Sequence, residues 1–114
     1  MIKLTLTDEQ AEIVSKACEF FARIKVGQFS EITWNMLARG SDDYLYKRNN
    51  AEKYLLEARK FIYPELHGAG HSYGIGKFKD ADMSFDVYQV IRYAMGDDRK
   101  PFSYRELPKC EQCD

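Results

Sequence analysis

Four stretches of the sequence repeat apolar residues every three or four positions, and this period is the strongest constraint on the fold. The stretches cover roughly residues 8–26, 29–39, 47–62 and 82–95. A period of about 3.6 residues is that of an amphipathic α-helix. Each stretch is followed by a residue that commonly ends a helix: Gly27, Gly40, Pro64 and Gly96. The sequence therefore predicts about four helices.

The first helix has the clearest start signal. Thr7 stands three residues before Gln10, which is the spacing of a capping box. Glu12 and Lys16 are spaced to form a favourable ion pair on the exposed face of this helix. Cys18 falls on the apolar stripe, which indicates an inert core thiol rather than a nucleophile.

The segment before this helix has a different pattern. Ile2, Leu4 and Leu6 alternate with polar residues, which is typical of a short strand with one buried face. An isolated strand leaves its backbone groups unpaired, so it needs a partner, and residues 102–107 are the best candidate. The predicted fold class is therefore α+β: mainly helical, with a small sheet that pairs the N- and C-terminal strands.

Composition limits the function classes. The 114 residues suit a single domain over 1–114, with 108–114 as a flexible tail. The 17 basic and 18 acidic residues give a net charge of −1, which provides no general attraction to nucleic acid or to an acidic membrane. Three cysteines do not suggest a secreted disulfide framework, so we expect a cytoplasmic location. The 14% aromatic content favours burial of surplus apolar surface between copies, most simply in a dimer.

The irregular stretch 63–79 holds four of the seven glycines and both histidines. A loop of this length in a small domain is commonly functional. Backbone N–H groups, a lysine and two histidines could bind an anion there, and the next helix carries three polar residues in an apolar setting. The predicted ligand-binding residues are His67, Gly70, His71, Ser72, Tyr73, Gly74, Gly76, Lys77, Asp86, Gln89 and Arg92.

The same residues also allow a structural interpretation. The glycines could simply permit a tight turn, and the polar residues of the helix could form a network that ties it to the loop through Ser72 or Tyr73. The loop is neither a Walker motif, because Phe78 replaces the required Ser/Thr, nor a dinucleotide fingerprint, because no strand precedes it.

A zinc-binding or nucleic-acid-binding module is the main alternative. Cys110 and Cys113 form a CxxC motif, and His67 and His71 have an HxxxH spacing, so the four residue types suit tetrahedral zinc. The CxxC motif lies at the end of the chain, however, and glycines between the histidines disfavour the helix that usually presents such a pair. We predict no metal and no cofactor. Basic residues are scattered among as many acids, so nucleic acid is an unfavoured partner.

Several segments resemble a group of small uncharacterised bacteriophage and prophage proteins. The resemblance is carried by Gly27–Ile32, Tyr63–Leu66, Ser72–Gly76 and Asp86–Arg92, and it spans residues 2–107. It implies a phage accessory protein that acts in the host cytoplasm, a class that often antagonises host defences. No catalytic residue is implied by the resemblance.

The sequence thus predicts a non-enzymatic binding protein with no membrane association. Its expected partner is a small anionic, nucleotide-type ligand or a host protein, bound through the glycine-rich loop 67–77. An enzyme acting on a phosphorylated small molecule ranks third, because nothing marks a nucleophile beside the two histidines.

Overall fold

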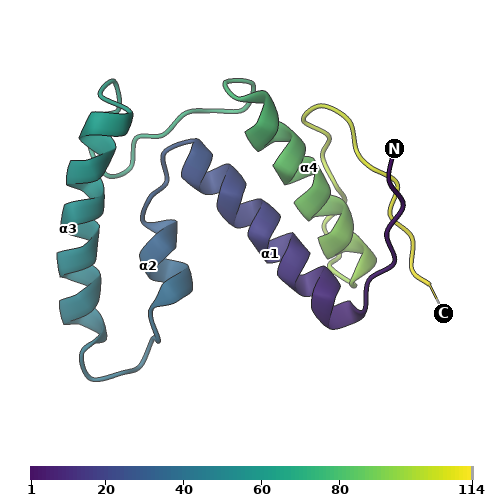
Figure 1. The fold of residues 1–114 in the computed structure, drawn as a ribbon, viewed down its shortest axis with the longest axis horizontal. Helices are drawn as coiled ribbons and strands as arrows, with labels where there is room; N and C mark the ends of the chain where they lie inside the picture. The colour runs from purple at the N-terminus through teal and green to yellow at the C-terminus, as the bar shows by residue number, and fades with distance from the viewer. Residues whose placement is uncertain (114) are drawn as a thin grey trace. The chain divides into compact units, whose positions relative to one another are not determined.

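The structure is a computed structural model that describes residues 1–113. In this range it contains four α-helices and no β-strand: α1 Asp8–Lys25, α2 Glu31–Met36, α3 Tyr44–Ile62 and α4 Lys79–Ala94 (Figure 1). The prediction of a mainly helical chain is confirmed. The predicted α+β class is wrong, because the N- and C-terminal segments form no sheet.

The missing sheet has a physical explanation in α4. The backbone N–H groups of Tyr104, Arg105 and Glu106 donate to the carboxylate of Asp86. Donors that a strand pairing would use are therefore already bonded to a side chain. Ile2 and Leu4, on the other predicted strand, are 95% and 71% exposed, so these two side chains do not face a core.

The residues group into two compact units, one made of Met1–Ala22 with Ile75–Asp114 and the other of Arg23–Gly74. Of the predicted flexible tail, 108–114, the described residues belong to the first unit. Its residues 108–113 are exposed and have no regular secondary structure, and Asp114 lies outside the described residues.

In the first unit, α1 and α4 lie side by side (Figure 1). The predicted capping box starts α1: the N–H of Thr7 donates to Oε1 of Gln10 at 3.0 Å, and the N–H of Gln10 donates to Oγ1 of Thr7 at 3.2 Å. Ser84 on α4 donates to the carbonyl of Cys18 on α1 at 2.6 Å. Small polar side chains therefore join the two helices at close range.

The buried face of α4 is mostly polar. Asp82, Asp86 and Gln89 are buried, and so are Ala81 and Val90. Met83 and Tyr93 on the same helix are exposed. Buried polar groups need partners, and these partners are described with the site below.

In the second unit, α2 lies against α3 (Figure 1). Thr33 on α2 is buried, and its hydroxyl donates to Glu52 on α3 at 3.0 Å. Gly27 ends α1 with φ +98°, a left-handed conformation that favours glycine. A Cβ atom at this position would lie 2.5 Å from Cδ1 of Leu66. Gly27 therefore permits both the turn and the close approach of the loop that follows α3.

None of the helices in the described residues is long and apolar enough to cross a membrane.

Candidate functional site

The most unusual side chain of the second unit is Arg59 on α3, which is only 3% exposed. Its Nη1 donates to the carbonyl of Gly27 at 3.1 Å and to that of His71 at 2.8 Å, and its Nη2 donates to the carbonyl of Gly68. One guanidinium thus joins α3 to the turn after α1 and to the glycine-rich loop.

The positive charge of Arg59 is not balanced by a carboxylate. Within the part of the chain that the structure describes, Arg59 forms hydrogen bonds to carbonyl groups but no ion pair. Carbonyl dipoles compensate a buried cation only in part, because removing a full charge from water costs several kcal/mol. Among the described residues, Arg59 is thus a buried cation held by neutral carbonyl groups.

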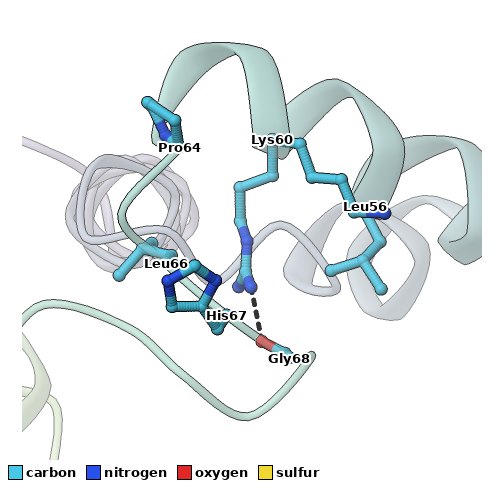
Figure 2. A pocket seen from close by; sticks show the side chains of 7 residues that line it. Leu56, Lys60, Pro64, Leu66, His67 and Gly68 are labelled. Atoms are coloured by element: carbon cyan, nitrogen blue, oxygen red, sulfur yellow. Dashed lines mark hydrogen bonds between the residues drawn. The ribbon is translucent and has the colours of Figure 1, made fainter.

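A cavity of about 350 Å³ lies beside this arginine. Its lining combines cationic or hydrogen-bonding groups from Arg59, Lys60 and His67 with apolar groups and a glycine: Leu56, Pro64, Leu66 and Gly68. Figure 2 shows Leu56 and Lys60 on α3, with Leu66, His67 and Gly68 on the loop that follows it. The volume is in the range of sites that hold small organic ligands, and no carboxylate of residues 1–113 lines the cavity.

The ammonium group of Lys60 can reach a ligand in this cavity with little loss of stability. Its ammonium pairs with Glu57 at 3.0 Å, but the lysine side chain is 60% exposed. Exposed ion pairs contribute little to stability. The long side chain of Lys60 can therefore turn toward a bound anion without a large loss.

The two histidines lie close together in the loop. The backbone N–H of His67 donates to Nδ1 of His71 at 2.9 Å, so a neutral His71 carries its proton on Nε2. Their ring centroids are 6.4 Å apart. Gly68, with φ +81°, turns the chain so that the N–H of His71 meets the Gly68 carbonyl at 3.2 Å. This tight turn lies beside the carbonyls that accept from Arg59.

The predicted ligand-binding residues are divided between the two units. His67, Gly70, His71, Ser72, Tyr73 and Gly74 belong to the second unit, and Gly76, Lys77, Asp86, Gln89 and Arg92 belong to the first. In the second unit, His67 and His71 meet, and the N–H of Tyr73 donates to the carbonyl of Val26 at 2.8 Å. Gly70 and Gly74 are exposed, and Ser72 is half-buried.

In the first unit, Asp86 and Gln89 bind the chain's own C-terminal segment. The carboxylate of Asp86 accepts three backbone N–H groups, from residues 104–106, at 2.7–2.9 Å. The amide of Gln89 donates to the carbonyl of Phe102 at 2.8 Å and accepts from its N–H at 2.6 Å. Asp86 and Gln89 therefore form a polar network on α4 whose partner is this segment.

Arg92 closes the turn that leads into this segment. Its Nη1 lies 2.9 Å from the carboxylate of Asp97, which Arg99 also contacts at 2.8 Å. The hydrogen bonds from Arg99 are the main reason that the pKa of Asp97 lies well below its usual range, and the same pair raises the pKa of Arg99. Gly76 and Lys77 are both exposed, and the N–H of Gly76 donates to the carboxylate of Asp82 at 3.1 Å.

The described residues contain no group of three or more His, Cys, Asp or Glu side chains arranged to hold a metal ion. Cys110 and Cys113, the CxxC of the zinc alternative, are exposed thiols. Although the residue is exposed, partial desolvation of its thiol, followed by the nearby Cys113 and Glu111, raises the pKa of Cys110.

Two residues that organise these sites, Arg59 and Asp82, were not among those predicted from the sequence. A signal existed for each. Arg59 follows Leu55 by four residues and Leu56 by three, which places a cation among apolar residues of one helix face. Asp82 precedes Asp86 by one helical turn and is 3% exposed.

Comparison of the chain with protein-family models, with curated proteins and with solved structures gives no match.

Proposed function

We propose that the protein binds a small anionic ligand, without converting it, in the cavity beside Arg59. The observation that carries this proposal is a buried guanidinium with no carboxylate partner next to a cavity. A bound anion would supply the missing counter-charge, and Lys60 and His67 would add donors at the rim. The proposed site overlaps the predicted one at His67 and shifts its centre to α3.

A phosphorylated small molecule fits the lining best. Arginine and lysine are the common phosphate-binding side chains, and Leu56, Pro64 and Leu66 offer an apolar wall for an organic group. A binding role is favoured over turnover because the part of the chain that the structure describes places no carboxylate, cysteine or hydroxyl nucleophile in the cavity lining.

The biological setting rests on the sequence resemblance. In that setting, a phage accessory protein in the host cytoplasm would sequester a nucleotide-type signal and so antagonise a host defence. Sequestration requires only affinity, which suits a site built from cationic and apolar groups.

Calorimetric titration with inorganic phosphate, pyrophosphate and AMP tests the binding proposal. Lys60→Gln should weaken binding by about fivefold to tenfold, which corresponds to one lost charged contact. Lys53→Gln is the matched control, because Lys53 is an exposed lysine two turns earlier on α3 that does not line the cavity. Equal affinity in the two variants, or no binding of any of the three anions at millimolar concentration, would refute the proposal.

A second candidate, binding of a host protein, is favoured by exposed aromatic residues on α3. Tyr46, Tyr54 and Phe61 are 74%, 68% and 89% exposed, and their spacing places them on one face of the helix. Tyr and Phe are enriched at protein interfaces. If this is the function, co-purification of a defined host protein should be lost in Phe61→Ser and retained in Lys60→Gln. The reverse result would favour the anion.

A further inference from the structure

The C-terminal segment 102–106, here called the strap, is held on α4 mainly through its backbone. Asp86 accepts the N–H groups of residues 104–106, and Gln89 bonds both backbone groups of Phe102. Asp82 adds one side-chain contact, to Nε of Arg105 at 3.1 Å. These three buried side chains, Asp82, Asp86 and Gln89, form a polar stripe along α4.

The strap contributes little apolar burial of its own. Phe102 is 72% exposed, and the ring of Tyr104 packs edge-on against Phe85 at 5.5 Å. The strap and the stripe also match in charge, because two buried carboxylates face three N–H groups and one guanidinium. The same segment of a second copy would make these contacts equally well.

The connection between α4 and the strap determines whether a strap binds the stripe of its own copy or that of a second copy. The turn begins at Gly96, which has φ +106°, and is closed by Asp97 with Arg92 and Arg99. Apart from its chain neighbours, no described residue has an atom within 4 Å of the position that a Cβ would take at Gly96, so a side chain there would disturb only the backbone conformation of the turn. Exchange of an identical segment between copies is a low-cost route to a dimer, and changes in the hinge loop promote it.

We propose that the chain dimerises by exchanging its straps, with residues 102–106 of each copy bound to the α4 stripe of the other. The exchange keeps every strap contact and opens the turn at Gly96, together with the contact between Arg92 and Asp97 that closes this turn. It also allows the hinge regions of two copies to cover exposed apolar side chains near the turn, among them Tyr93 and Met95. This inference does not depend on the proposed ligand.

Two hinge variants test the proposal by light scattering after size exclusion. Gly96→Ala makes the closed turn costly but leaves an extended hinge unstrained, so the dimer association constant should rise about tenfold or more. Insertion of four Gly/Ser residues between Asp98 and Arg99 relaxes the closed turn and should shift the population toward monomer. Circular dichroism would verify that both variants are helical.

Mixing two defective copies distinguishes exchange from any other dimer. Asp86→Asn damages the stripe but not the strap, and Arg105→Pro damages the strap by removing one N–H donor and the partner of Asp82. Only in an exchanged heterodimer can an intact strap bind an intact stripe, so the mixture should form a dimer more strongly than either variant alone, as read by native mass spectrometry.

Three results would overturn the proposal. One is a monomer in both wild type and Gly96→Ala at concentrations on the order of 100 μM. Another is a dimer whose population is unchanged by either hinge variant, since its interface would not involve the strap. The third is a mixture of Asp86→Asn and Arg105→Pro that dimerises no better than its components.

Discussion

Replacement of Asp86 by alanine is the strongest test of how the first unit is held together. The carboxylate is 1% exposed and accepts three backbone N–H groups at 2.7–2.9 Å. Hydrogen bonds to a charged group contribute about 1.5–3 kcal/mol each. The three losses will not add, because a released strap regains water on its N–H groups. We expect Asp86→Ala to lower the free energy of unfolding by about 3 kcal/mol.

Urea unfolding followed by circular dichroism measures this loss. For a small protein, 3 kcal/mol corresponds to a midpoint lower by roughly 1–2 M urea. Asp98→Ala is the matched control, because it removes an exposed aspartate from the same unit, and it should change stability by less than about 0.5 kcal/mol.

Amide hydrogen exchange locates the effect. The N–H groups of residues 104–106 should be protected in the wild-type protein and lose most of that protection in Asp86→Ala. A loss of stability below about 1 kcal/mol, or unchanged protection of these three amides, would show that the strap is held by something other than Asp86.

Three further predictions follow from local geometry. Gly27→Ala should lower the free energy of unfolding by about 1–3 kcal/mol, measured by thermal unfolding, because alanine at φ +98° is strained and its Cβ would lie 2.5 Å from a leucine side chain; an unchanged melting temperature would contradict this. Because hydrogen bonds from Arg99 lower the pKa of Asp97 below its ordinary 3.8, its contribution to stability should be complete above pH 4 and disappear as the pH falls through the lowered pKa. Asp97→Asn should therefore matter at pH 7 and less at pH 3 in urea unfolding, and an equal effect at both would refute the assignment. Replacement of Cys110 and Cys113 by serine should leave the fold intact, since both thiols are exposed; loss of one bound zinc per chain together with unfolding would show the opposite.

Local features of this chain could be read from its sequence. The Thr7–Gln10 capping box and the Glu12–Lys16 ion pair at 3.0 Å both form as their spacing predicts. Each depends on residues within one turn of a helix, where spacing fixes geometry. Gly27 likewise ends α1, because a left-handed turn depends on one residue and its immediate neighbours.

Features that depend on distant partners could not be read in the same way. The strap was predicted as a strand because backbone donors usually find another strand, and nothing local shows that Asp86, 18–20 residues earlier, takes them. Arg59 was missed because a charged residue on an amphipathic helix is normally exposed. Its three carbonyl partners come from 9, 12 and 32 residues away.

The composition of the interior affects how stability changes with temperature. Among the described residues, the buried apolar side chains are few and mostly small: Ala22, Val26, Leu66, Ala81 and Val90. The heat-capacity change of unfolding rises with the apolar area exposed and falls with the polar area. An interior in which Arg59, Asp82 and Asp86 take core positions should therefore give a small heat-capacity change and a broad, shallow stability curve. For such a protein, cooling would lower the free energy of unfolding less than it does in a protein with a large apolar core.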